Sequence, residues 1–182
     1  MSIADSIRDR VPPTNRLIAA LPSKDRARLL ATCDDVELVF ADILVEPGAR
    51  IRHVYFPTGR SYISMMVPVD AAAALEVGLV GNEGMLGVSL VLGVDASPLR
   101  ALVQGAGQAL RMSAASFKRE FQESTALQRE LNHYLYVLIA QLAQSAACVR
   151  FHKIEARLAR WLLMTQDRSQ ADRFRITHTF LA

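Results

Sequence analysis

The side chains that could perform catalysis in this sequence do not fall into the spacings that the main catalytic motifs require. Ser89 lies in Gly87-Val-Ser-Leu-Val91, which lacks the closing glycine of the G-x-S-x-G turn that presents a nucleophilic serine. None of the three lysines follows a glycine-rich loop, so the chain has no phosphate-binding P-loop. The repeated glycines of Gly78–Gly84 lie between strand-like runs and are interpreted as turn residues. These patterns argue against a hydrolase.

Residues that could bind a metal are also too dispersed for a site. Cys33 and Cys148 are far apart and belong to no CxxC spacing, which zinc and iron–sulfur sites usually need. Only His53 lies in the part of the chain that resembles strands, whereas a metal-binding barrel of the cupin kind needs several converging ligands. We therefore interpret His53 as a surface residue at a strand end, and we expect no metal, no cofactor and no enzymatic activity.

The composition is that of a folded protein with an uneven charge. Of the 182 residues 51% are hydrophobic and 21% charged, which excludes a disordered or low-complexity chain. Residues 1–110 carry 10 basic and 12 acidic side chains, whereas residues 111–182 carry 11 basic and 6 acidic ones. A polyanion such as DNA would therefore be expected to meet the C-terminal part.

The sequence shows no targeting signal. Charged residues are interspersed in the first ten positions, and the most apolar stretches, Gly84–Val94 and Tyr134–Val149, are shorter than the roughly 18 residues of a membrane span. We expect a soluble, cytoplasmic protein with reduced thiols.

Hydrophobic periodicity divides the chain into three parts. Residues 15–33 have helical spacing, and Pro22-Ser23 within them is a helix-start signal. Residues 36–112 show short alternating runs such as Tyr62–Val67, Leu75–Leu79 and Ala101–Met112, separated by Gly- and Pro-rich turns. This pattern indicates an antiparallel sandwich or barrel, and no helix-length segment interrupts it.

Helical spacing returns after Ser113, the expected N-cap of a helix over 114–122. A helix without Gly or Pro is predicted over Thr125–Phe151, and a third over Ile154–Thr165. A polar turn, a short strand-like run at 174–176 and a new helix start at Thr177 follow before the sequence stops at Ala182. Because a helix cannot stand on a single turn, we expect the sequence to break off within a larger module.

The long helix has apolar positions that alternate in steps of four and three. This spacing is typical of a coiled-coil seam, and we favour a parallel dimer interface. The alternative, which the spacing leaves open, is that the seam packs on the sheets; in the dimer, Tyr134, Tyr136 and Ile139 on other faces would cover the barrel instead. The predicted dimer-interface residues are Leu131, Leu135, Leu138, Leu142, Ser145 and Val149.

The order of these elements, together with particular segments, resembles the Crp/Fnr family of bacterial transcription regulators. The segments are Arg52-His-Val-Tyr-Phe-Pro57, Val77-Gly-Leu-Val-Gly-Asn-Glu-Gly-Met-Leu-Gly87 and the tail from Glu155 to Met164 with Ile176–Ala182. The resemblance covers the chain from about Asn15 onward. It implies an α+β fold: an antiparallel double-stranded β-helix (jelly-roll) sensor barrel, a long dimerisation helix and an incomplete winged helix-turn-helix.

The resemblance also implies three domains. Residues 1–112 would form the N-terminal helix and the cyclic-nucleotide-binding-like barrel, residues 113–152 the short helix and the long dimerisation helix, and residues 153–182 the start of the DNA-binding module.

Two segments depart from the members of the family that bind cyclic nucleotides. Where those members have a Gly-Glu pair for the ribose, this chain has Gly87-Val88-Ser89, and where they have an Arg two positions before Ala, it has Leu99-Arg100-Ala101. A one-residue slip on a strand turns a side chain to the opposite face, so Arg100 would point away from the pocket unless a bulge restores it. Cyclic AMP and cyclic GMP are therefore not expected, and the effector is unknown.

The resemblance places two further sets of residues, each with a purely structural alternative. The ligand-position residues, which would otherwise simply fill the barrel, are Gly84, Met85, Leu86, Gly87, Val88, Ser89 and Arg100. The residues near backbone phosphates of DNA, which would otherwise form a solvated helix face, are Arg150, Lys153, Arg157 and Arg160.

The predicted function is a dimeric DNA-binding transcription regulator of the Crp/Fnr type that senses an unknown effector. The sequence stops before a recognition helix, so sequence-specific DNA binding would need the absent C-terminal part. The alternative is a stand-alone effector-sensing or interaction dimer that does not read DNA. A cupin-like enzyme would share the barrel but lacks the metal ligands.

Overall fold

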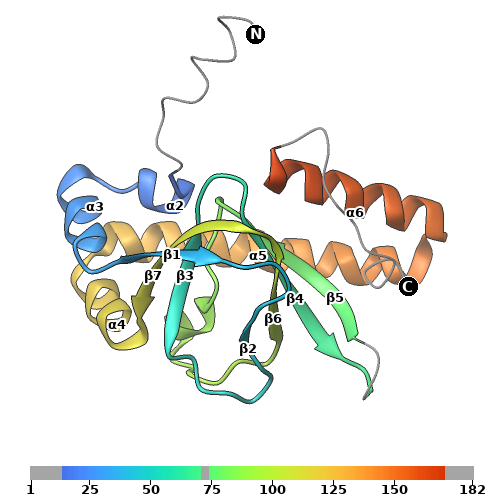
Figure 1. Cartoon of the computed structure of the whole chain (residues 1–182), viewed down its shortest axis with the longest axis horizontal. Coiled ribbons are helices and arrows are strands. Elements are labelled where there is room, and N and C mark those ends of the chain that lie inside the picture. The colour runs from blue at the N-terminus through green and yellow to red at the C-terminus, as the bar shows by residue number, and fades with distance from the viewer. Residues whose placement is uncertain (1–13, 71–73, 171–182) are drawn as a thin grey trace, which may run out of the picture.

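The computed structural model describes residues 14–70 and 74–170, in which two antiparallel sheets are flanked by helices (Figure 1). Helices α2 (Arg16–Ala19) and α3 (Ser23–Leu30) precede the sheets. The periodicity predicts one helical region over 15–33, but the structure separates it at Pro22, which lacks a backbone N–H and disfavours helical geometry in the residue before it.

Asn15 fixes the start of the described chain to the sheets. Its side-chain oxygen accepts hydrogen bonds from the backbone N–H groups of Leu17 and Ile18, which caps α2. Its side-chain nitrogen donates to the carbonyl oxygens of Pro57 and Gly84, at 3.0 and 2.8 Å. One buried amide therefore joins the first helix to two separate turns of the sheet region.

The sheets contain three and four strands in the described residues. The smaller sheet has the order β1-β7-β3 and the larger the order β2-β6-β4-β5, and every pair is antiparallel. The strands are β1 (Asp34–Leu38), β2 (Ile43–Val45), β3 (His53–Pro57), β4 (Tyr62–Pro68), β5 (Ala74–Val80), β6 (Arg100–Gly105) and β7 (Gly107–Ser113).

The alternating run over 101–112 is not a single strand. It turns between β6 and β7, which belong to different sheets. Gly107 has a φ of +155°, and a Cβ at this position would lie 3.1 Å from the Cβ of Ser61. The glycine is needed where the chain leaves one sheet for the other.

Apolar side chains form two cores. One lies between the sheets, and its buried members include Leu38, Ile63 and Val103 from the strands, together with Leu86 and Leu138 from outside them. The other lies where the smaller sheet meets the helices, and it contains Val54, Phe56 and Phe117. The alternation of β3 explains the second core, because Val54 and Phe56 share one face while His53 and Tyr55 share the other.

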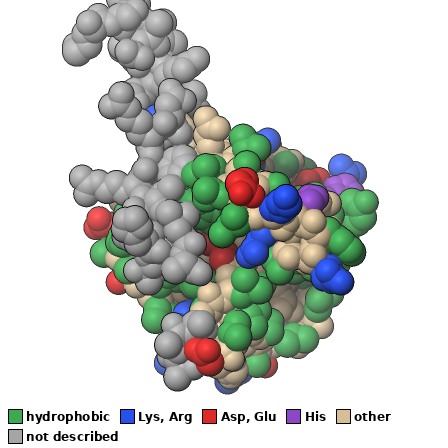
Figure 2. Space-filling model, turned by 90° about the vertical axis from the view of Figure 1, so that its right-hand side faces the viewer, with side chains coloured by type: hydrophobic (Ala, Val, Ile, Leu, Met, Phe, Trp, Pro, Cys, Tyr) green, Lys and Arg blue, Asp and Glu red, His purple; other side chains and the backbone are tan. Residues whose placement is uncertain are grey.

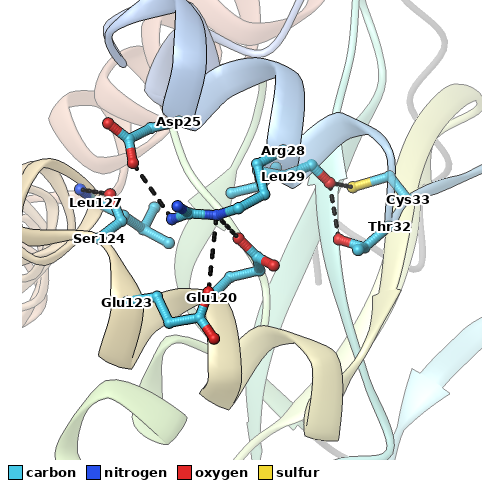
Figure 3. A network of polar contacts seen from close by, with 9 residues as sticks. All are labelled: Asp25, Arg28, Leu29, Thr32, Cys33, Glu120, Glu123, Ser124 and Leu127. Carbon is cyan, nitrogen blue, oxygen red and sulfur yellow. Dashed lines mark hydrogen bonds and ion pairs between the residues drawn. The ribbon is translucent and has the colours of Figure 1, made fainter.

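An ion-pair network joins the N-terminal helices to α4 (Ala114–Glu123). Figure 3 shows Arg28 of α3 between three carboxylates: Asp25 at 3.2 Å, Glu120 at 2.7 Å and Glu123 at 4.0 Å. The Glu120 side chain is only 5% exposed, so Arg28 neutralises a carboxylate that water hardly reaches. Helix α4 starts as predicted, because the Ser113 hydroxyl accepts a hydrogen bond from the Ser116 N–H.

The long helix α5 has the predicted bounds, Thr125–Phe151. Ser124 caps it by accepting a hydrogen bond from the Leu127 N–H at 3.1 Å. By length and composition alone α5 could cross a membrane. Its buried residues, among them Leu127, Leu131 and Tyr134, instead pack in the core with the sheets and α4.

Helix α6 (Ile154–Ser169) turns back after His152 and runs over β5 and the second half of α5 (Figure 1). It is four residues longer than the predicted Ile154–Thr165 and ends at Ser169, where the next residue, Gln170, forms the C-cap with a φ of +48°. The predicted strand-like run at 174–176 and the helix start at Thr177 lie outside the described residues.

Candidate effector site

A cavity of about 520 Å³ opens between the larger sheet, β3 and α5. Its wall is mainly apolar, with side chains from β2, β4, β6 and α5. Its volume falls in the range of pockets that hold small-molecule ligands. The lining residues that the following argument uses are Glu46, Arg52, Tyr55, Ser89, Leu138 and Leu142.

Four of the predicted ligand-position residues line this cavity: Leu86, Gly87, Val88 and Ser89. Two backbone hydrogen bonds between Leu86 and Tyr55, at 2.8 and 3.2 Å, hold the segment against β3. Gly87 then turns the chain with a φ of +92°, and a Cβ there would lie 3.0 Å from Val54. The structure thus brings together the second half of the predicted segment.

The first half of that segment lies elsewhere. Met85 is buried in the core between the smaller sheet and the helices, and Gly84 packs against α5, where an added Cβ would overlap the ring of Tyr134. Neither residue lines the cavity. In this structure Gly84 and Met85 pack against Tyr134 and the core behind the cavity, and their predicted contact with an effector has no support from the cavity lining.

Arg100 also lies outside the cavity. Its neighbours Leu99 and Ala101 line the cavity, and alternation along β6 turns the Arg100 side chain to the other face. There its Nε donates to Glu46 Oε2 at 2.8 Å. The register shift between Ile43 and Val45 of β2, opposite Leu102 and Ala101 of β6, does not bring Arg100 into the cavity lining. A contact of Arg100 with a ligand stays a prediction that this geometry does not favour.

Several lining residues gave no signal in the sequence. His53, expected at the surface, is half-buried and borders the cavity beside Tyr55, with their ring centroids 6.4 Å apart. Arg52 and the strand Ile43–Val45 also contribute. Alternation shows which residues share a face of a strand, but it does not show which strands of the two sheets surround a common space.

The predicted dimer seam on α5 is largely occupied by the chain itself. Leu131 is fully buried in the core with the helices, and Leu138 is buried in the core between the sheets. Leu142 packs against the same core and, with Leu138, lines the cavity. These three residues therefore have contacts within the chain, as in the alternative that the four-three spacing left open, and their part in a dimer interface stays a prediction.

The remaining residues of the seam and its flanks follow from this orientation. Leu135 and Ser145 are half-buried, and Val149 is exposed near the end of the helix. Tyr134 is buried as expected, but Tyr136 and Ile139 are 75% and 62% exposed and do not cover the sheets. The exposed apolar face of α5 is thus on the side away from the sheets.

Helix α6 is attached to the sheet through a buried carboxylate. Glu76 of β5 accepts a hydrogen bond from Trp161 Nε1 at 2.8 Å and one from the Ser64 hydroxyl at 2.7 Å. Burial raises the pKa of Glu76, while the hydrogen bonds from Ser64 and Trp161 and the charge of Arg168 act in the opposite direction. Trp161 is the only tryptophan in the chain, so its fluorescence reports on this contact.

A second attachment of α6 involves both the sheet and α5. Arg168 of α6 pairs with Glu83 at 3.1 Å and donates to the side-chain oxygen of Gln141 at 3.4 Å. The same Gln141 oxygen accepts from the backbone N–H of Leu79 in β5 at 3.2 Å. Gln141 therefore contacts α6 and the sheet, from a position adjacent to the cavity residue Leu142.

The predicted phosphate-contacting residues differ in their surroundings. Arg150, Lys153 and Arg157 are exposed. Figure 2 views the end of the molecule where α5 turns into α6, and it shows Lys and Arg side chains among hydrophobic ones. Arg160 instead packs against α5, where it donates to the Gln141 carbonyl oxygen at 3.5 Å. In this arrangement Arg160 is half-buried and points to a helix rather than to solvent.

The buried Glu76 carboxylate predicts that the difference in stability between the wild type and a Glu76→Gln variant depends on pH. Because the pKa of Glu76 is raised in the folded state, folded protein binds this proton more tightly than unfolded protein does. Its contribution to stability is full below the ordinary value of 4.5 and is lost as the pH rises through the raised pKa. A Glu76→Gln variant cannot titrate, so its melting temperature relative to the wild type should increase between pH 5 and pH 8.

Melting curves of both proteins at the two pH values measure this difference. The charged and titratable groups that act on Glu76 and remain in both proteins are Tyr62 on β4 and Arg168 on α6, with Ser64 and Trp161 as hydrogen-bond donors. An equal difference at pH 5 and pH 8 would show that Glu76 does not titrate in this range.

Burial raises the pKa of the Cys33 thiol to about 12, which disfavours the nucleophilic thiolate. Residues 14–70 and 74–170 contain no group of three or more His, Cys, Asp or Glu side chains placed to hold a metal ion.

Comparisons with known proteins identify the fold. No protein-family model and no curated protein matches the sequence. A Crp/Fnr-family transcriptional regulator from Eubacterium rectale has a similar structure, with 10% identity, a TM-score of 0.72, and 91% of this chain and 77% of that chain covered.

Two further structures have the same arrangement. The c-di-GMP responsive global regulator CLP of Xanthomonas campestris has 16% identity and a TM-score of 0.66, with 86% of this chain and 76% of that chain covered. The catabolite activator protein of Thermus thermophilus has 13% identity and a TM-score of 0.58, with 91% and 77% covered. At these identities the likeness concerns the fold.

Proposed function

We propose that this chain, which has the fold of the Crp/Fnr regulators' sensor region, is the effector-sensing and dimer-forming part of a bacterial transcription regulator. The observation that carries the proposal is the position of α5. This helix forms one wall of the cavity through Leu138 and Leu142, and through Gln141 it contacts α6, the first helix after the sensor. An effector in the cavity and the segment that follows the sensor would thus touch the same helix.

The proposed organisation keeps the three domains expected from the sequence. Residues 1–112 are the sensor, residues 113–152 the connecting helices, and residues 153–182 the start of a DNA-binding module. Arg150, Lys153 and Arg157 are exposed and are proposed to lie near backbone phosphates. Such a regulator acts in the bacterial cytoplasm and needs no catalytic residue.

Dimerisation is proposed through the exposed face of α5. Tyr136 and Ile139 are large apolar side chains three positions apart, so they lie on the same face of the helix. The exposed residues Ala140, Ala143 and Ala147 continue this face and leave room for a second helix to approach closely. Two copies of α5 packed along this face would cover apolar surface that one chain leaves in water.

A double substitution, Tyr136→Lys with Ile139→Lys, tests this interface. We expect the wild-type chain to sediment as a dimer and the variant as a folded monomer, because four lysines would meet in the dimer without a partner charge. Sedimentation velocity gives the mass, and circular dichroism shows that the variant folds.

The matched control is Val69→Lys, which places a lysine on an equally exposed apolar residue away from α5. This control should remain dimeric. A wild-type monomer, or a variant that stays dimeric, would contradict the proposed interface.

A further inference from the structure

The cavity has an apolar wall and a polar wall. The apolar wall is formed by Ile43–Val45 of β2, Met65 of β4 and Leu138 and Leu142 of α5. All charged or hydroxyl-bearing lining residues instead belong to the segments 46–55 and 87–89 or are Ser97. An occupant would therefore contact hydrocarbon from β2, β4 and α5, and polar groups from the other lining segments.

Part of the polar wall is already paired within the chain. Glu46 accepts from Arg100 at 2.8 Å, and Arg50 lies 3.4 Å from Asp95. The Ser97 hydroxyl donates to the Leu99 carbonyl oxygen at 2.7 Å. These groups do not need a ligand to satisfy them.

Apart from the ring of His53, which can donate or accept, the groups that remain are hydrogen-bond donors. Within the described residues, the side chains of Arg52, Tyr55 and Ser89 have no hydrogen bond or ion pair, and each can donate. The only lining carboxylate, Glu46, is the one paired with Arg100. The unpaired part of the wall thus has a positive charge and needs an acceptor.

We propose that the cavity binds a small organic acid, with a carboxylate held by the Arg52, Tyr55 and Ser89 side chains and an apolar body against β2, β4 and α5. A medium-chain or aromatic carboxylic acid has this chemistry. The inference specifies the effector class of the proposed function and rests on it for the regulatory meaning of binding. Arg52 is exposed at the cavity, so it meets the carboxylate at the solvent side while the body lies inside.

A cyclic nucleotide fits the two walls less well. Its ribose hydroxyl needs an acceptor, but Glu46 is already occupied by Arg100. The polar edges of its base would lie against leucine, isoleucine and methionine side chains, which offer no partner. Arg100, whose sequence neighbours Leu99 and Ala101 line the cavity, points to the other face of β6.

Titration calorimetry with three probes tests the chemistry at pH 8: octanoic acid, 1-octanol and cyclic AMP. We expect octanoate to bind at one site per chain, octanol at least about tenfold more weakly because it lacks the charge-assisted contact, and cyclic AMP not detectably. Equal binding of octanol would overturn the anionic part of the proposal. Tighter binding of cyclic AMP, or no binding of octanoate, would overturn the whole.

Variants locate the site. Arg52→Gln should weaken octanoate binding about tenfold and leave octanol unchanged, since it removes the cation and keeps a polar side chain of similar length. Arg60→Gln, which neutralises an arginine outside the cavity, should leave both affinities unchanged. Equal octanoate affinity in Arg52→Gln and the wild type would contradict the assigned carboxylate contact.

The sedimentation experiment separates this inference from the proposed function. If octanoate does not bind but the wild type is a dimer that Tyr136→Lys with Ile139→Lys dissociates, only the effector class is wrong. If the wild type is a monomer, the proposed dimeric regulator fails regardless of ligand binding.

Discussion

Replacing Leu131 with lysine is expected to unfold the protein. A residue of a coiled-coil seam would be buried by a second chain and exposed in a single chain. Leu131 is instead fully buried within one chain, together with Phe117, Leu127 and Tyr134. The lysine would place an unpaired ammonium in this core and remove the leucine's packing. The expected loss exceeds about 4 kcal/mol, a large part of the stability of an ordinary domain.

Thermal and urea unfolding followed by circular dichroism measure this loss. The surface control is Tyr136→Lys, whose side chain is 75% exposed and whose folded state should be retained. Leu131→Met, which keeps a buried apolar side chain of similar volume, should cost less than about 1.5 kcal/mol. A Leu131→Lys protein that stays folded and becomes monomeric would instead support the seam as a dimer interface.

Replacing Gly84 with alanine is expected to have the second-largest effect. The added methyl group would overlap the ring of Tyr134, which is buried and donates to the Met85 carbonyl oxygen at 3.4 Å. Because the ring is buried in the core, overpacking should cost about 1–3 kcal/mol. For a domain of this size the melting temperature falls by roughly 2–4 °C per kcal/mol.

Gly78→Ala is the matched control for this prediction. Its added methyl group would lie 2.8 Å from the terminal carbon of Met65, a flexible side chain that can turn away. It should therefore lower the melting temperature less than Gly84→Ala does. Tyr134→Leu combined with Gly84→Ala should cost less than the sum of the two single changes, and additive costs would show that the two residues do not clash.

Local signals in the sequence predicted many element boundaries. Ser113 caps α4 as expected, and the absence of Gly and Pro over Thr125–Phe151 gave the full extent of α5. The fold class was implied by the resemblance to the Crp/Fnr family. These features depend on neighbours within a few residues, which is the range that periodicity and capping describe.

Local signals could not predict which surface the apolar face of α5 packs against. A four-three spacing gives the same pattern whether the face meets a second chain or the chain's own sheets, and Leu131 and Leu138 meet the latter. Alternation did predict that a slipped Arg100 turns outward. The contact of Trp161 with Glu76 joins residues 85 positions apart and has no local signal.

Because α5 extends far beyond the cavity, a tilt of this helix would move its far end more than the part that lines the cavity. Leu138 borders the cavity, and the helix continues without Gly or Pro to Phe151, a distance of about 20 Å at 1.5 Å per residue. A tilt of about 5° at Leu138 would therefore move the far end by about 1.7 Å. That end carries the turn into α6, so such a tilt would displace the start of α6 more than it displaces the cavity wall.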